Sequence, residues 1–382
     1  MNPLSGCTAA SPYMELDALV NKAAYAIRMM RLARWMTTQL SNDYDRRVVG
    51  RMVLVFAPIY IEAAFGIRKK PPGLREADRA QLRNGIRQLR SDFEEFYDRI
   101  RHDLAAHRDA MPLDIAIEAW NEIDSDTLAW FCAAAQESIE DIIARHSQLA
   151  GSVKDFPDQS SEELAHKLAV PGEEAGTMRF STDALSMTRG DAGIVPVHEV
   201  QDSAMVLMSV LQSLKACHRI NELVRGHLAS HLLLKSMFVI DTMNLVDGIY
   251  GEPIGASPKR SASFLRVLED GDFGGAPSLR RSLDEVDLQA VEAVRRVRNK
   301  ACAHLDPASP LKELQSMVLD LEDAVILDRL LNPAVAALEK ACAEDVTTRW
   351  LLINEASLSG INLVSSPAVR AFDRDQSSES ND

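Results

Sequence analysis

The sequence has few cysteines, few aromatic residues and fewer basic than acidic residues, and the first and last of these features argue against particular classes of protein. Its cysteines are odd in number, widely scattered and without a CxxC pair: Cys7, Cys132, Cys217, Cys302 and Cys342. This pattern argues against a disulfide framework or a cysteine-built zinc site, and it favours a reducing cytoplasm. The net charge of −14 argues against broad, non-specific binding of polyanions, although it allows a local basic cleft.

Apolar runs long enough to cross a membrane are also lacking. The longest, MVLVFAPIYIEAAFGI at Met52–Ile67, contains a proline and a glutamate. It is too short to span a bilayer, and the first residues show neither the basic nor the apolar region of a signal peptide. We therefore interpret Met52–Ile67 as a buried helix and expect a soluble, cytoplasmic protein with no membrane partner.

Several chemical signatures are missing from the sequence. It contains no GxxxxGK[ST] phosphate loop, no GxGxxG and no HExxH. His227 and His231 stand four residues apart, a spacing that suits a metal on one helix face, but no third ligand lies nearby. We interpret them as a helix-surface pair, and we predict no metal and no cofactor.

What the sequence does contain favours helices. Leu, Ala, Met, Glu and Arg abound, and aromatic residues make up 5%. We predict an all-α protein of two related up-down bundles of four to five helices, a first block (12–150) and a second block (197–345), which form an intramolecular pseudo-dimer. A polar connector (151–196) lies between them. A short β-hairpin is considered in the connector and at 346–364, and the tail, 365–382, is predicted to be disordered.

The two blocks align with each other. Residues 53–64 match 232–243 at an offset of 179, and residues 92–107 match 289–304 at an offset of 197. We attribute the difference of 18 to a longer Gly/Pro/Ser loop at about 250–282 in the second block. This self-similarity indicates a duplication and favours packing about a pseudo-two-fold axis.

A long amphipathic helix is predicted near the end of each block. It begins after a Pro-Leu pair, Pro112 in the first block and Pro310 in the second, and ends near Arg145 and Ala343.

One motif occurs once in each block. IRHDLAAHRD (100–109) and VRNKACAHLD (297–306) both place a histidine six residues after an arginine and an aspartate two residues later. The arginine fork matches a phosphate, and a histidine transfers protons near neutral pH. On a straight helix this spacing separates the two side chains by about 120° and about 9 Å along the axis. A compact site therefore needs two motifs that face each other.

The motifs resemble the Arg-(x4–6)-His signature of HEPN domains, in which a polar residue follows the arginine. Members of this family are all-helical bundles that typically pair, with both motifs lining one cleft, and many are metal-independent endoribonucleases of toxin–antitoxin and antiviral defence systems. The resemblance implies RNA as the substrate and a regulatory protein or antitoxin as a candidate partner. It implies acid/base roles for His107 and His304 and phosphate-stabilising roles for Arg101 and Arg298.

The resemblance also assigns supporting residues. His102 and Asn299 hold the polar position after the arginine and would orient the phosphate or the histidines. Some toxins of the family carry a modifiable tyrosine two residues after the histidine, where this chain has Asp109 and Asp306. That form of regulation is therefore not inferred. The internal pair would allow a monomer, but it does not exclude a higher homo-oligomer.

Further candidates lie outside the motifs. Glu62 and Asp241 occupy aligned positions in strongly apolar helices, so each needs a partner or access to solvent. A motif arginine is one candidate partner, and a solvent-facing carboxylate is the alternative. Residues 67–90 hold eight basic residues against two acidic ones, which suits either an RNA-guiding wall or a solvated helix face. The candidate RNA-contacting cations are Arg68, Lys69, Lys70, Arg295, Arg296 and Lys300.

Two other readings of the repeated motif stay open. A duplication preserves a structural histidine as well as a catalytic one. The chain could therefore be a non-catalytic HEPN pair that binds nucleotide, RNA or protein. It could also be a helical interaction scaffold that keeps both motifs as relics.

Overall fold

The computed structural model describes residues 12–69, 74–100, 125–145, 162–169, 197–224, 226–251, 263–270, 272–306 and 309–344. Every regular element in these ranges is a helix, so the all-α prediction is confirmed. In chain order the elements are α1 (Pro12–Gln39), α2 (Asp43–Lys69), α3 (Glu76–Ile100), α5 (Ser125–Arg145), α7 (Glu162–Ala169), α9 (Val197–Val224), α10 (Leu228–Tyr250), α11 (Phe264–Asp270), α12 (Ala276–Asp284), α13 (Leu288–Val297), η2 (Arg298–Cys302), α14 (Leu311–Leu319), α15 (Asp323–Ile326), η3 (Leu327–Leu331) and α16 (Asn332–Glu344).

Helix α2 is the buried centre of the first block. The Asn42 side chain accepts a hydrogen bond from the amide of Tyr44 at 2.8 Å, which caps the start of the helix, and two cations in its last turn complement the helix dipole. The helix is longer than the apolar run Met52–Ile67, so by length and composition α2 could cross a membrane, contrary to the expectation from that run, but 89% of its most apolar window is buried inside the protein. The prediction that Met52–Ile67 forms a buried helix is therefore confirmed.

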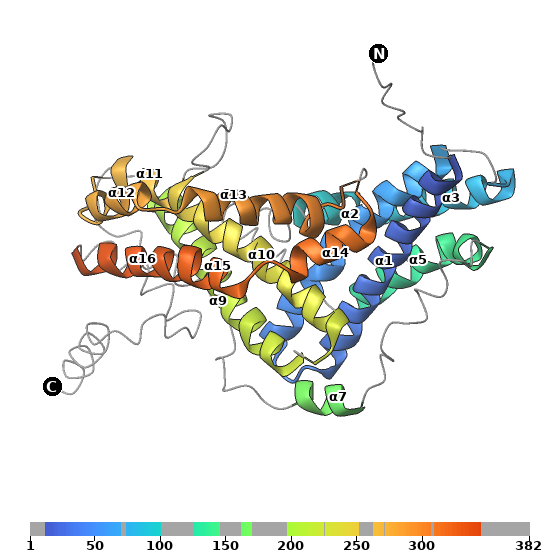
Figure 1. Cartoon of the computed structure of the whole chain (residues 1–382), viewed down its shortest axis with the longest axis horizontal. Helices are drawn as coiled ribbons and strands as arrows, with labels where there is room; N and C mark the ends of the chain where they lie inside the picture. The colour runs from blue at the N-terminus through green and yellow to red at the C-terminus, as the bar shows by residue number, and fades with distance from the viewer. Residues whose placement is uncertain are drawn as a thin grey trace, which may run out of the picture.

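Two long helix pairs form the framework. Helix α1 packs along α2, and α9 packs along α10. Figure 1 shows these pairs as two arms of a V that meet near α7, a short helix that contacts both α1 and α9. Helices α13 and α14 cross the open side of the V, and α3 and α5 cover the outer side of the first pair. Both motifs follow helices that pack on the framework, α3 on α2 and α13 on α10.

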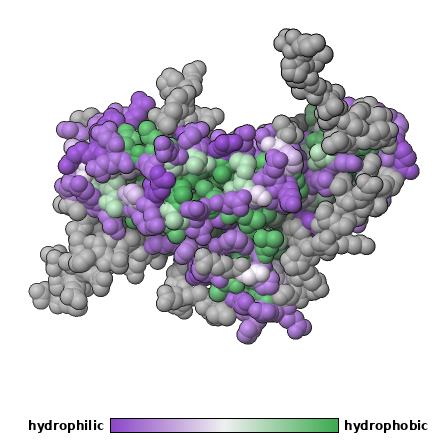
Figure 2. Space-filling model, in the orientation of Figure 1, coloured by the Kyte–Doolittle hydropathy of each residue, from purple (hydrophilic) through white to green (hydrophobic). Residues whose placement is uncertain are grey.

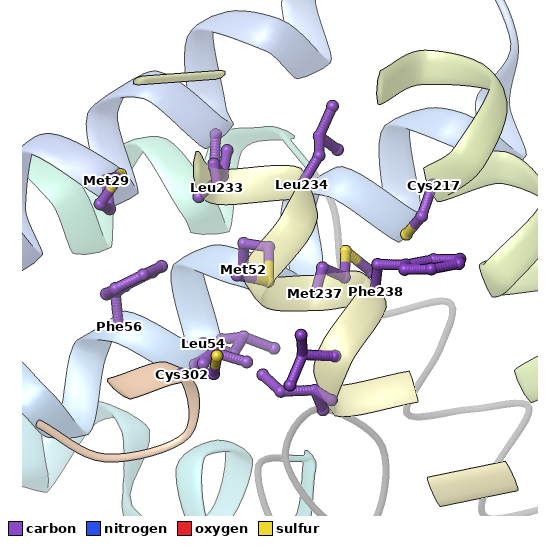
Figure 3. Close-up of a cluster of buried hydrophobic side chains, with 14 of the residues drawn as sticks. Met29, Met52, Leu54, Phe56, Cys217, Leu233, Leu234, Met237, Phe238 and Cys302 are labelled. Atoms are coloured by element: carbon purple, nitrogen blue, oxygen red, sulfur yellow. The ribbon is translucent and has the colours of Figure 1, made fainter. Parts of the chain in front are cut away.

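The two arms share one hydrophobic core. A single cluster of buried side chains runs from α1 through α2, α9 and α10 to α16. Figure 3 shows side chains of α2 facing those of α10, joined by Met29 of α1, Cys217 of α9 and Cys302 of η2, with Cys302 beside Leu54. Those labelled are Met29, Met52, Leu54, Phe56, Cys217, Leu233, Leu234, Met237, Phe238 and Cys302. In the view of Figure 2 this apolar interior reaches the surface between α13 and α14, inside a hydrophilic margin.

Ion pairs also join the two blocks. The Arg51 guanidinium in α2 donates to both oxygens of Asp241 in α10, at 3.0 and 2.8 Å, and both side chains are almost fully buried. Ser213 in α9 donates to the same carboxylate. A second pair joins Arg219 in α9 to Asp45 in α2 at 2.5 Å. Burial raises the pKa of Asp45 above its ordinary value, although Arg219 opposes the shift.

The first aligned pair lies in the second helix of each block, whereas the second pair begins in the third helix of the first block and the fifth of the second, because α11 and α12 intervene. Residues 53–64 lie in α2 and 232–243 lie in α10. The second aligned pair begins in α3 and in α13, and its first copy then leaves the described residues. The pseudo-two-fold axis itself stays a prediction. Both proposed hairpins and the tail lie outside the described residues.

Three details of the sequence prediction need correction. The Gly/Pro/Ser loop at 250–282 contains α11 and α12, because the apolar side chains of Phe264, Leu268 and Leu279 are buried in the core. The connector contains α7, which buries two leucines. The long helix after Pro310 is interrupted between α14 and α15, although it begins at Leu311 and its last segment ends at Glu344, as expected.

Candidate functional site around the second motif

The second motif begins where α13 changes into a π-helical turn. The Asp287 side chain caps α13 by accepting a hydrogen bond from the Ala290 amide at 3.0 Å. From Arg298 onward the helix is widened, and the amide of Ala303 donates to the Arg298 carbonyl, five residues back, at 2.8 Å. Single π turns inside α-helices are rare and occur frequently at functional sites. The straight-helix angle between arginine and histidine therefore does not apply to this motif.

Arg298 faces inward and pairs with a carboxylate. Its Nη1 lies 3.3 Å from one oxygen of Asp247 in α10, and Nη2 of Arg295 lies 2.6 Å from the other oxygen. The Arg298 side chain is only 8% exposed. Two guanidinium groups one helical turn apart thus converge on a single carboxylate, and this contact holds α13 against α10.

His304 lies just beyond the π turn and is half-buried, with residues 301 to 303 before it fully buried. Asp306 follows in a tight turn, in which its amide donates to the Lys300 carbonyl at 2.9 Å. The Asp306 carboxylate accepts a hydrogen bond from Ser309 at 3.0 Å and lies 3.4 Å from the Lys300 ammonium. Asp306 therefore holds together the turn that carries His304.

The polar and basic residues around the motif divide into two groups. Asn299 and Arg296 are exposed and Lys300 is 45% exposed, so these three side chains can meet a ligand directly. Arg295 and Arg298 face Asp247 instead. The cations predicted to contact RNA are therefore only partly available in this arrangement.

Cys302 closes the π turn on its buried side. Burial raises the pKa of its thiol to about 12, while a hydrogen bond with Ser236 and the charge of Arg298 oppose the shift. A thiol with this pKa is almost wholly protonated at neutral pH, so Cys302 packs as a small apolar side chain.

The aligned carboxylates Glu62 and Asp241 have different surroundings. Asp241 is fully buried and pairs with Arg51, so its expected need for a partner is confirmed, and this partner is not a motif arginine; a contact with Arg101 stays a prediction, because Arg101 lies outside the described residues. Glu62 is exposed, as the solvent-facing alternative predicted. In the described structure, neither Glu62 nor Asp241 lies in the turn that carries the second motif.

Arg68 and Lys69 lie in the last turn of α2, and both contact the ring of Phe65 in the same helix. Their charged groups lie 4.6 and 4.3 Å from the ring centroid of Phe65, within cation–π range. Phe65 is 37% exposed. Lys70 lies outside the described residues, and so does the first motif, with Arg101, His102, His107 and Asp109. The structure therefore describes only the second half of the predicted composite site.

In the part of the chain that the structure describes, no three His, Cys, Asp or Glu side chains lie close enough together to hold a metal ion. His231 contacts the Asn221 side chain at 2.8 Å through Nδ1, and His227 precedes the first turn of α10.

Sequence reasoning missed three residues. Asp247 and Lys22 contact the second motif, Lys22 through a hydrogen bond from its ammonium to the Asp306 carbonyl at 2.5 Å, and Arg51 is the partner of Asp241. Arg51 and Lys22 are single cations inside apolar stretches, and that pattern is a usable sign of a buried ion pair or hydrogen bond. Asp247 shows no comparable sign, because its position near the end of α10 suits an exposed side chain equally well.

No protein-family model, no curated protein and no solved structure matches this chain. The chemistry of the region must therefore be argued from its own residues. The second motif offers a half-buried imidazole, a neighbouring exposed lysine and two arginines bound to one carboxylate. These groups suit an oxyanion and general acid/base chemistry.

Proposed function

We propose that this chain is a HEPN-like, metal-independent endoribonuclease. Its site would combine Arg298 and His304 with Arg101 and His107 of the first motif. The observation that carries the proposal is the half-buried His304 at the end of a π-helical turn, with Arg295, Arg296, Arg298 and Lys300 on the preceding turns of a chain whose net charge is −14. A cationic cluster that departs so far from the overall charge suits an anionic substrate.

The proposed reaction is transesterification. One histidine takes the proton of the ribose 2′-hydroxyl as its oxygen forms a bond to phosphorus. The bond from phosphorus to the 5′-oxygen breaks, and the second histidine donates a proton to that leaving oxygen. An arginine stabilises the charge on the phosphate oxygens during the transfer. The products are a 2′,3′-cyclic phosphate and a 5′-hydroxyl, so water takes no part as a nucleophile, and the histidines and arginines supply the proton transfer and charge stabilisation that a metal ion would otherwise provide.

The test is cleavage of a labelled single-stranded RNA in EDTA by the wild-type chain and by His304→Ala, His107→Ala and the double variant. Loss of one acid/base group is expected to slow cleavage by about 10²–10⁴-fold. His166→Ala, an exposed histidine in α7, is the matched control and should cleave like the wild type. Cleavage that depends on added magnesium, or that survives the double substitution, would contradict the proposal.

A second candidate function is favoured by the contact between Arg298 and Asp247. Because this arginine is buried and already paired, it reaches a phosphate only by leaving Asp247. A non-catalytic module that binds RNA, nucleotide or protein through its exposed residues needs no such rearrangement. RNA binding without cleavage, unchanged in His304→Ala, would support this second candidate over the first.

A further inference from the structure

Lys22 connects the first block to the second motif. It lies in α1, and its Nζ donates to the backbone carbonyl of Asp306 at 2.5 Å, across 284 residues of sequence. The residue is only 4% exposed. Burial lowers the pKa of its ammonium, while the charge of Asp306 opposes the shift. Burying an ammonium is costly unless its hydrogen bonds are satisfied, so the contact with Asp306 accounts for a cation on the buried side of α1.

The contact between Lys22 and Asp306 lies at the C-terminal end of the segment 298–306, and a second contact holds the N-terminal end of the same segment. Asp247 of α10 binds Arg298 at the start of the π turn, and Lys22 of α1 binds the Asp306 carbonyl after it. Between these two points the chain forms two internal hydrogen bonds, from Ala303 to Arg298 and from Asp306 to Lys300. His304 lies in this interval, so its backbone is fixed from both sides by helices of different blocks.

We propose that Lys22 is a positioning residue that sets the place of His304. The first block would then shape the second motif directly, through α1, in addition to any contribution from its own motif. The consequence for catalysis rests on the proposed function, whereas the consequence for the conformation of the turn does not.

The chain offers a matched control in Lys235 of α10. This lysine is 5% exposed, its ammonium donates to the Leu319 carbonyl at 3.1 Å, and it pairs with Asp323. It is therefore a second buried lysine bound to a backbone carbonyl, but at the far end of α14 from the motif turn. Lys22→Met and Lys235→Met remove equivalent groups, and Lys22→Arg retains a donor at the first position.

Hydrogen exchange tests the positioning without reference to activity. In Lys22→Met the amides of Ala303 and Asp306 should exchange about tenfold faster than in the wild type, because a hydrogen bond from a charged donor to this turn is lost. Lys235→Met should leave both amides unchanged, and Lys22→Arg should restore much of the protection. Unchanged exchange in Lys22→Met, or equal acceleration in both methionine variants, would overturn the proposal.

Steady-state kinetics on the same variants tests the catalytic consequence. Lys22→Met should lower kcat about tenfold and leave KM unchanged, because a small displacement of an acid/base group acts mainly on the chemical step. Lys22→Arg should recover kcat. If the wild type cleaves RNA and Lys22→Met cleaves equally well, the positioning role is wrong. If the wild type does not cleave RNA, the proposed function is wrong, and the exchange result alone decides the role of Lys22.

Discussion

At the scale of single residues, several groups of the second motif, both side-chain and backbone, already have hydrogen-bond or ion-pair partners. Arg298 is paired with Asp247, and the carbonyl of Asp306 accepts from Lys22. His304 is half-buried, next to residues that are fully buried. A functional site is improved by such support, because groups held by packing and hydrogen bonds need less reorganisation during a reaction.

The thiol of Cys302 should be chemically inert in the folded protein. Its pKa of about 12 leaves a thiolate fraction on the order of 10⁻⁴ at pH 8. In a Cys7→Ser, Cys342→Ser background, a disulfide reagent such as DTNB should therefore label no cysteine within minutes under native conditions and three cysteines in guanidinium chloride. Rapid native labelling that Cys302→Ala abolishes would contradict this expectation.

At the scale of helices, α2, α3 and α5 meet at one small side chain, Ser138. The Tyr60 hydroxyl of α2 shares a hydrogen bond with the Ser138 hydroxyl, which also lies 2.9 Å from the Ala135 carbonyl. Gly85 of α3 approaches the same residue so closely that a Cβ built there would lie 2.3 Å from the Ser138 Cβ. The first-block helices thus depend on a small residue at 85 and at 138.

Gly85→Ala is expected to destabilise the protein by about 1–3 kcal/mol, because the added methyl group forces α3 and α5 apart. The sign is the reverse of the usual one, since alanine for glycine inside a helix ordinarily stabilises by about 1 kcal/mol. Denaturant unfolding measures the change. Gly226→Ala, where nothing lies within 4 Å of the new atom, is the control and should stay within about 0.5 kcal/mol of the wild type.

Tyr60 should make the protein sensitive to alkali. Burial raises its pKa to about 12 in the folded state, against an ordinary value of 10.0. The folded form therefore keeps a proton that the unfolded form loses first, and the associated stability is complete below pH 10 and lost as the pH rises through 12. The loss is about 3 kcal/mol. Unfolding free energies of the wild type and Tyr60→Phe, measured from pH 8 to 12, should diverge above pH 10, and parallel curves would contradict the assignment.

At the scale of the whole molecule, the two blocks are joined by charge as well as by apolar contact. Arg51 and Asp241 lie in the central helices of different blocks and bury a full ion pair between them. Such a pair adds little net stability compared with well-packed apolar side chains, but it tolerates only the arrangement in which both charges meet. We infer that it helps to fix how the two arms of the V dock.

Replacing only one member of the Arg51–Asp241 pair should strongly destabilise the folded protein. Arg51→Met or Asp241→Asn alone is expected to lower the free energy of unfolding by about 3–5 kcal/mol, because each variant leaves buried groups without their partner. The double variant Arg51→Met, Asp241→Leu should recover most of that loss, which a double-mutant cycle in denaturant measures. Arg266→Ala, which removes the exposed partner of the exposed Asp270, is the control and should cost less than about 1 kcal/mol. Additive losses at 51 and 241 would show that the pair is not coupled.

Much of the fold was predictable from periodicity and composition, whereas the details of the site were not. Apolar spacing indicated α2 and α10, and the Pro-Leu pair at Pro310 indicated the start of α14. The π turn was not predictable, because VRNKACAHLD also suits an ordinary helix, and the turn packs against α10, a helix whose position the local sequence does not reveal. The partner of Asp241 was missed because its arginine stands 190 residues earlier, and spacing along the chain carries no information on that distance.

Because the two blocks share one core, part of α2 stays uncovered while the rest of the chain is being synthesised. The side of α2 that contacts α9 and α10 is covered only once Tyr250 has been synthesised, 181 residues after Lys69. At about 5–20 residues per second, a ribosome needs roughly 9–36 s to make that stretch. During this interval the nascent chain presents one of its most apolar surfaces to the cell, so chaperones that bind emerging polypeptides should associate with the first half of this protein.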